Sequence, residues 1–231
     1  TTNRPASWQD VPIFLCPSDP SGATYPNGAQ TAGRLSYFGS IGAMADWTAR
    51  LIGAAGLKQA ALVGHSMGAL VALDCAARHS DKVRTLGLCG VASEMPVHPE
   101  MLESAKANTV KVQELMTFWG MGNALHKGGM VSPGLWLRRE SLAVLAGNKP
   151  GVIHTDLAAC NAYKDAPARA AAVKCPTVFV LGDGDLMTPA PKAKALVAAI
   201  AGSTAVTIPN CGHFMMVERP DETLEALKSR V

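Results

Sequence analysis

A serine lies between two glycines at the end of an apolar run, in the segment GHSMG at residues 64–68. The segment fits the pattern G-x-S-x-G, in which a sharp turn from strand to helix exposes the central hydroxyl. Such a turn strains the backbone of the serine and leaves little room for neighbouring side chains, which favours Gly64 and Gly68. The pattern therefore predicts that Ser66 is a nucleophile. The alternative is a glycine-rich helix start that Ser66 caps with its side chain.

Two later segments contain the groups that would activate such a serine. A serine hydroxyl is a weak nucleophile at neutral pH, so it needs a base within hydrogen-bonding reach and an acid that orients the base. The segment NCGHFMMVERP at 210–220 contains His213, and LGDGDLMTP at 181–189 contains Asp183 and Asp185. Each segment directly follows an apolar run. We therefore expect both to reach the rim of the sheet at which the serine is presented.

A sheet has to bring these three segments together. Short apolar runs bounded by turn residues predict buried parallel strands at 12–16, 60–63, 85–89, 177–182 and 205–208. Apolar residues at helical spacing predict helices at 41–55, after Ser66, and within 191–202 and 218–231. This alternation of strands and helices predicts an open α/β sheet with right-handed crossovers.

Residues 92–174 depart from this alternation, because they contain several helix-like segments divided by turns rich in glycine and proline. We interpret them as a helical cap inserted into an α/β core, whose first part is 1–91 and whose second part is 175–231. The cap is rich in methionine and tryptophan. Candidate residues for the wall of a substrate pocket are Met116, Trp119, Met121 and Trp136, and packing within the cap is the alternative interpretation.

Three segments, GHSMG, GDGDLMTP and GHFMMVERP, resemble the nucleophile, acid and histidine segments of the α/β-hydrolase superfamily. They also follow in that superfamily's order of serine, acid and histidine. The resemblance is to the branch of small esterases, lactonases and cofactor-free perhydrolases, and it extends from about Pro12 to the C-terminus. It implies an α/β-hydrolase fold with a helical cap, with Ser66 as nucleophile, His213 as general base and Asp185 as orienting acid.

Two other carboxylates stay open as the acid. The family pattern G-x-x-D, counted from Gly182, favours Asp185 over its neighbour Asp183. In some relatives the acid follows an earlier strand, and Glu94 is the candidate at that position.

The resemblance also implies two backbone donors for the oxyanion of a tetrahedral intermediate. One is the amide of Met67, directly after the nucleophile. The other usually belongs to a loop marked by His-Gly, a dipeptide that this sequence lacks. We therefore expect that the N-terminal strands are missing or atypical: either the sequence begins within the enzyme, or residues 1–34 have an unusual arrangement.

The resemblance implies hydrolysis of a carboxylic ester or lactone through an acyl-enzyme, with no metal or organic cofactor. The same three side chains are compatible with cleavage of a carbon–carbon bond, with perhydrolysis or with a lyase reaction. A ligand-binding protein without catalysis is a further alternative. His65 is expected to serve packing, with its side chain turned away from the nucleophile, and the other four histidines outside the site (His79, His98, His126 and His154) to be surface or cap residues.

Composition narrows the class of partner. The 231 residues carry a formal net charge of +3 without a basic cluster, which argues against a nucleic-acid partner. The sequence has no apolar stretch long enough for a membrane span and no apolar signal-peptide centre near residue 1, so a cytoplasmic protein is expected. Six scattered cysteines indicate buried thiols rather than disulfides or a zinc site. We expect a small-molecule substrate and leave monomer and homodimer open.

Overall fold

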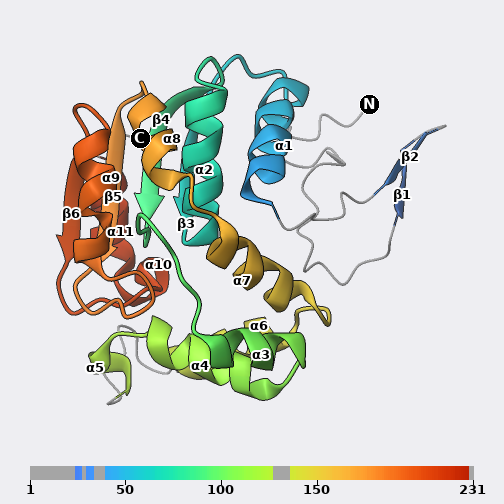
Figure 1. The fold of residues 1–231 in the computed structure, drawn as a ribbon, viewed down its shortest axis with the longest axis vertical. Coiled ribbons are helices and arrows are strands. Elements are labelled where there is room, and N and C mark those ends of the chain that lie inside the picture. The colour runs from blue at the N-terminus through green and yellow to red at the C-terminus, as the bar shows by residue number, and fades with distance from the viewer. Residues whose placement is uncertain (1–23, 28–29, 34–39, 127–135, 229–231) are drawn as a thin grey trace, which may run out of the picture.

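The computed structural model describes residues 24–27, 30–33, 40–126 and 136–228 (Figure 1). Its main sheet has four parallel strands in the order β3 (Ala60–His65), β4 (Val83–Cys89), β5 (Thr177–Gly182) and β6 (Thr204–Ile208). Four of the five predicted strands are thus confirmed, and the fifth, at 12–16, lies outside the described residues. A separate antiparallel pair, β1 (Thr24–Asn27) and β2 (Gln30–Gly33), precedes them.

The register of the strands brings their carboxyl ends to one edge. Gly64 pairs with Leu88, and Gly182 pairs with Ile208, so all four strands end at similar heights. Every residue of β5 is buried, as the continuous apolar run predicts for a central parallel strand. The segments that carry Ser66, Asp185 and His213 all follow these carboxyl ends.

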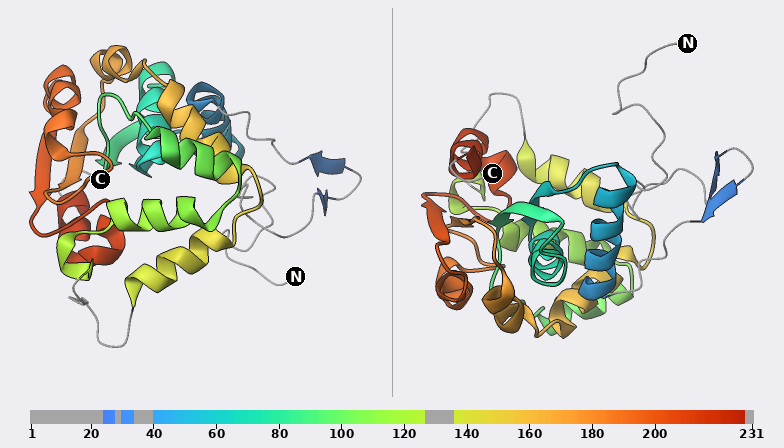
Figure 2. Two further views of the ribbon diagram at one scale, coloured as in Figure 1. Left: turned by 60° about the horizontal axis from the view of Figure 1, so that its bottom comes forward. Right: turned by 90° about the horizontal axis from the view of Figure 1, so that it is seen from above.

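Helices cover both faces of the sheet (Figures 1 and 2). On one face, α2 packs against α1 and α8, and α8 packs against α9, which follows a short 3-10 turn. On the other face, α11 contacts β5 and β6. These helices are α1 (Ile41–Ala54), α2 (Met67–Arg78), α8 (Ala166–Ala172), α9 (Lys194–Ala199), α10 (Met215–Glu218) and α11 (Pro220–Lys228). The arrangement is an α/β-hydrolase fold with a parallel sheet flanked by helices.

Between β4 and β5 the described residues form helices joined by turns and loops, with no strand among them. The helices are α3 (Pro99–Lys106), α4 (Val110–Gly120), α5 (Asn123–His126), α6 (Leu137–Ala146), α7 (Val152–Ala162) and α8. The first four lie beyond the carboxyl edge of the sheet, where they form a separate layer (Figure 1). Helix α7 leads from this layer back to the main core, to which its Ala159 and Cys160 belong. The last, α8, instead packs on α2, and its Ala166 and Ala170 belong to the main core.

A buried carboxylate ties the end of this layer to the core. Asp74 on α2 accepts a hydrogen bond from the Tyr163 hydroxyl at 2.9 Å, directly after α7. It also pairs with Arg78 at 2.6 Å and with Arg169 of α8 at 2.8 Å. The buried charge is therefore neutralised by partners from two elements. Of the helices described, none has the length and apolar character needed to cross a membrane.

Candidate active site

Ser66 lies at the turn between β3 and α2 with a backbone φ of 54° and ψ of −119°. A positive φ is unfavourable for a serine, so the surrounding structure must hold this conformation. The Ser66 amide donates to the Cys89 carbonyl at 2.9 Å. A Cβ atom at Gly64 would lie 2.1 Å from the Gly68 carbonyl oxygen, so only glycine fits there. A Cβ atom at Gly68 would meet no described atom within 4 Å, so the predicted need for glycine is confirmed at residue 64 alone.

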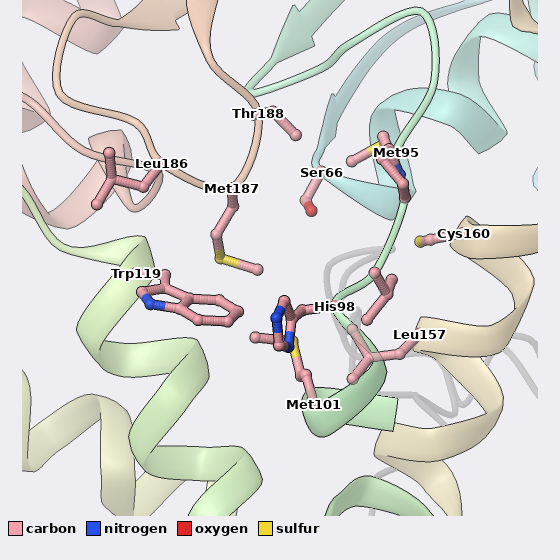
Figure 3. A pocket seen from close by; sticks show the side chains of 12 residues that line it. Ser66, Met95, His98, Met101, Trp119, Leu157, Cys160, Leu186, Met187 and Thr188 are labelled. Carbon is pink, nitrogen blue, oxygen red and sulfur yellow. The ribbon is translucent and has the colours of Figure 1, made fainter. Parts of the chain in front are cut away.

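The hydroxyl of Ser66 does not cap the helix that it precedes. Its side chain accepts no hydrogen bond from the first turn of α2, which argues against the alternative interpretation of a capping serine. Instead, the side chain points into a cavity beneath the helices that follow β4 (Figure 3). A strained backbone and an uncommitted hydroxyl that faces a cavity are the features a nucleophile requires.

His213 and Asp185 form a buried pair. Nδ1 of His213 lies 2.8 Å from Oδ2 of Asp185, and the two residues are 1% and 3% exposed. The carboxylate also accepts hydrogen bonds from the amides of Met187 and Thr188, each at 2.8 Å, and from the Thr188 hydroxyl at 2.7 Å. Burial alone would raise the pKa of Asp185, but the hydrogen bonds from His213 and Thr188 outweigh it and lower the pKa.

This pairing fixes where the imidazole carries its proton. An ionised carboxylate only accepts hydrogen bonds, so Nδ1 of His213 must be the donor. In the neutral ring, Nε2 then holds a lone pair, and this atom is buried without a hydrogen-bond partner among the described residues. Ser66 and His213 line the same cavity, although their side chains form no hydrogen bond with each other here. Such bonds often form only when substrate is bound.

The other two carboxylates considered from the sequence have different partners. Asp183 accepts a hydrogen bond from the Cys211 amide at 3.2 Å and so supports the loop that precedes His213. Glu94 is exposed and pairs with Lys164 at 3.4 Å. Of these three candidates, only Asp185 contacts the imidazole of His213.

His65 also holds His213, in a way that the sequence did not indicate. Its Nε2 lies 2.8 Å from the His213 carbonyl oxygen, and the two ring centroids are 4.6 Å apart. Rather than turning away from the site, the His65 ring thus packs on the histidine and lines the same cavity as Ser66. Burial and then repulsion from His213 lower the pKa of His65 to about 4, so the ring is neutral at physiological pH.

A buried glutamate holds the loop on both sides of His213. Glu218 is 2% exposed and accepts hydrogen bonds from the Gly212 amide at 2.9 Å and the Phe214 amide at 3.1 Å. The same carboxylate accepts a third hydrogen bond at 3.0 Å from the amide of Gly122, two residues after the end of α4. Glu218 therefore joins the histidine loop to the helical layer over the sheet. The sequence analysis did not identify it, because nothing local distinguishes it from a surface carboxylate.

Two cavities meet at Ser66. The first, of about 360 Å³, is lined mainly by apolar side chains: Met95, Pro96, Val97, Met101, Trp119, Leu157, Cys160, Leu186 and Met187, with His98 and Thr188 (Figure 3). The second, of about 320 Å³, is lined by His65, Met67, Gly68, Met116, Leu145, Asn148, Ile153, Asp156, His213 and Phe214, and it shares Leu157, Cys160 and Met187 with the first. His213 lines the second cavity only, together with His65, Asn148 and Asp156.

The predicted pocket wall needs correction. Trp119 lines the first cavity and Met116 lines the second. Met121 is only 1% exposed and lines neither of them, because it follows the last residue of α4 and no longer continues that helix face. Trp136 is 53% exposed at the start of α6 and also lines neither. His98, expected at the surface or in the cap, instead lines the first cavity and lies edge-on to Trp119.

Met67 follows Ser66 directly and lines the second cavity. The segment expected to be atypical, residues 1–34, lies outside the described residues apart from β1 and β2.

Within the described ranges, no cluster of three or more histidine, cysteine or acidic side chains could hold a metal ion.

Three comparisons with known proteins agree on the kind of protein to which the chain is similar. A family model described as "Alpha/beta hydrolase family" matches residues 9–226. The "Putative carbamate hydrolase RutD" of Klebsiella pneumoniae strain 342 is 29% identical over 212 residues, which cover 83% of this chain and 73% of that protein.

Solved structures give the same picture for the fold. The enol-lactonase from Burkholderia xenovorans LB400 superposes with a TM-score of 0.73 at 20% identity, over 82% of this chain and 72% of that one. The esterase EaEST from Exiguobacterium antarcticum superposes with a TM-score of 0.73 at 18% identity, over 89% of this chain and 78% of that one. At these identities the likeness concerns the fold alone.

Proposed function

The chain belongs to the alpha/beta hydrolase family, and from this premise we propose that it cleaves a carboxylic ester or lactone through an acyl-enzyme formed on Ser66. The observation that carries the proposal is the environment of the two ring nitrogens of His213. Asp185 binds its Nδ1 at 2.8 Å, and the opposite nitrogen is buried without a partner among the described residues, in the cavity that Ser66 lines. This is the arrangement that a general base requires.

In the first half of the reaction, Nε2 of His213 takes the proton of the Ser66 hydroxyl while Oγ attacks the carbonyl carbon. The carbonyl oxygen becomes an oxyanion, and the Met67 amide donates a hydrogen bond to it. Asp185 stabilises the imidazolium that has formed. The intermediate then collapses, the bond to the alcohol oxygen breaks, and His213 returns its proton to that oxygen.

In the second half, water replaces the alcohol. His213, neutral again, takes a proton from the water while the remaining hydroxide attacks the acyl carbon. Collapse of this second intermediate breaks the bond to Ser66 Oγ, and the imidazolium protonates the serine. An ester gives one carboxylic acid and one alcohol, a lactone gives one hydroxy acid, and the side chains are regenerated without a cofactor.

Substitution of the nucleophile tests this proposal. Ser66→Ala should lower the turnover of a short p-nitrophenyl ester by at least about a thousandfold, since the covalent step is lost. Ser80→Ala, which removes an exposed hydroxyl in the turn after α2, is the matched control and should keep the activity of the unsubstituted chain. Full activity of Ser66→Ala would reject the proposal.

A carbamate is the second candidate substrate, and the similarity to RutD, which is named for carbamate hydrolysis, favours it. The same attack on a carbamate carbonyl would give a carbamoyl-enzyme, whose hydrolysis is slow because nitrogen donates electrons to the carbonyl. A p-nitrophenyl carbamate should then give a burst of p-nitrophenol equal to one equivalent of enzyme, followed by slow turnover. Faster turnover of the ester than of the carbamate, with no burst from the carbamate, would favour esters as the substrate class.

A further inference from the structure

A second carboxylate lies in the cavity that holds the imidazole of His213. Asp156 is on α7, and its neighbours on that helix face, Ile153 and Cys160, line the same cavity. Unlike Asp185, the Asp156 side chain has no hydrogen bond or ion pair with any described residue. The amide of Asn148, which also lines this cavity, is already bonded to the Val144 and Leu145 carbonyls at 3.4 Å and 3.0 Å.

The surroundings of Asp156 leave its charge uncompensated. Burial raises the pKa of Asp156 to about 6, and no neighbouring charge contributes to this shift. The titratable groups that face the same cavity are His65 from β3, His213 before α10 and Cys160 from α7 itself. His65, with its pKa lowered to about 4, and Cys160, with its pKa raised to about 12, are both neutral at pH 7. A partly buried carboxylate without a partner favours a cation beside it.

The proposed reaction indicates which part of a substrate would reach Asp156. The leaving oxygen must approach Nε2 of His213 to receive its proton, and His213 lines the second cavity but not the first. The alcohol portion therefore occupies the second cavity. The acyl portion occupies the first, whose wall of Met101, Trp119 and Leu157 suits an apolar chain.

We propose that Asp156 binds a protonated amine on the alcohol portion of the substrate, so that the preferred substrates are esters of an apolar acid with an amino alcohol. This inference rests on the proposed ester hydrolysis for its orientation of the substrate. Asp156 is here a substrate-binding residue that acts on specificity, and the chemical steps remain with Ser66 and His213.

Two esters of the same size test the proposal. Dimethylaminoethyl butyrate and isopentyl butyrate differ only in a protonated nitrogen in place of a CH group, and release of butyric acid from each is followed by titration. The unsubstituted chain should prefer the amino ester in kcat/KM by about tenfold or more, as expected for a hydrogen bond to a charged group. Asp156→Asn keeps the shape and should bring this ratio close to one.

The ratio of the two substrates also isolates the titration of Asp156, because protonation of His213 affects both substrates equally. The preference should rise as the pH passes through about 6, where Asp156 ionises, and it should be independent of pH in Asp156→Asn. Glu114→Gln removes one negative charge from an exposed position on α4 outside both cavities, and it should keep the preference.

Binding of the alcohol products separates this inference from the proposed reaction. Calorimetric titration of the unsubstituted chain with dimethylaminoethanol and with isopentyl alcohol needs neither turnover nor a stable variant. Tighter binding of the amine above about pH 6 supports the role of Asp156 even if neither ester is cleaved. Equal binding of the two alcohols, or a substrate preference that Asp156→Asn retains, would overturn it while leaving hydrolysis at Ser66 intact.

Discussion

The imidazole of His65 donates a hydrogen bond to the backbone carbonyl of His213, with 2.8 Å between nitrogen and oxygen. The residue directly before the proposed nucleophile, Ser66, thus holds the histidine that would activate it. Because a carbonyl only accepts, Nε2 of His65 carries the proton, and a low pKa keeps the ring neutral. The strand end and the histidine loop are therefore positioned as one unit.

Removal of this contact should slow catalysis. His65→Phe retains a flat ring but cannot donate to the His213 carbonyl, so the imidazole is positioned less accurately. We expect kcat to fall by about tenfold to a hundredfold with a smaller change in KM, since small misplacements of catalytic groups have effects of this size. His154→Phe on α7, outside both cavities, is the matched control. An unchanged kcat in His65→Phe would show that the contact does not position His213.

The buried carboxylate of Glu218 should matter for stability. Glu218→Gln has the same shape, but its amide group must face at least one of the three backbone N–H groups that now donate to the carboxylate. We expect the free energy of unfolding to fall by about 1–3 kcal/mol, the effect of a buried polar group left without a partner. Urea denaturation measures this. Glu222 is exposed on α11, and Glu222→Gln should change the free energy of unfolding by less than about 0.5 kcal/mol. Equal losses in the two variants would contradict the proposed role of Glu218 in holding the loop.

Parts of this site follow from the sequence and parts do not. The bounds of β5 were predictable, and those of β3 to within two residues, because a local pattern, an apolar run followed by a turn, specifies a strand. The positions of Ser66 and His213 after strand ends follow from the same pattern. Thr188, Glu218 and Asp156 were not, because their roles depend on contacts between segments far apart along the chain. Glu218, for example, accepts from Gly122, 96 residues earlier. Trp136 was wrongly assigned to the pocket because residue type alone does not determine which way a helix end faces.

The Thr188 hydroxyl gives a prediction that depends on pH. Hydrogen bonds hold the pKa of Asp185 below its ordinary value of 3.8. The ionised carboxylate therefore stabilises the fold above that pH, and the stabilisation is lost as the pH falls through the lowered pKa. Thr188→Val removes one donor and raises this pKa.

Thr188→Val should accordingly lower the free energy of unfolding by about 1–2 kcal/mol at neutral pH. The difference from the unsubstituted chain should narrow as the pH falls below about 4, where Asp185 takes up a proton in both. Denaturation curves recorded from neutral to acidic pH test this. Thr48→Val, which removes a hydroxyl bonded to the Met44 carbonyl on α1, should give a difference independent of pH. A stability difference that does not vary with pH in Thr188→Val would contradict the hydrogen bond from the Thr188 hydroxyl to Asp185.

Substitution by alanine should change the free energy of unfolding in opposite directions at Gly64 and Gly68. Gly64→Ala places a methyl group 2.1 Å from a backbone oxygen, and we expect a loss of several kcal/mol in stability or failure to fold. Gly68→Ala meets no described atom within 4 Å and lies in α2. It should raise the free energy of unfolding by about 0.5–1 kcal/mol, because alanine favours helix over glycine. Equal losses from both changes would contradict the geometry of this turn.

The central claim is that His213 makes the Ser66 hydroxyl reactive, and covalent labelling with a fluorophosphonate tests it most directly. Peptide mass spectrometry of the labelled chain should find one adduct, on Ser66, and His213→Asn should slow its formation by at least about a hundredfold. An intact chain whose Ser66 stays unlabelled, or an adduct that forms equally fast without His213, would contradict the account.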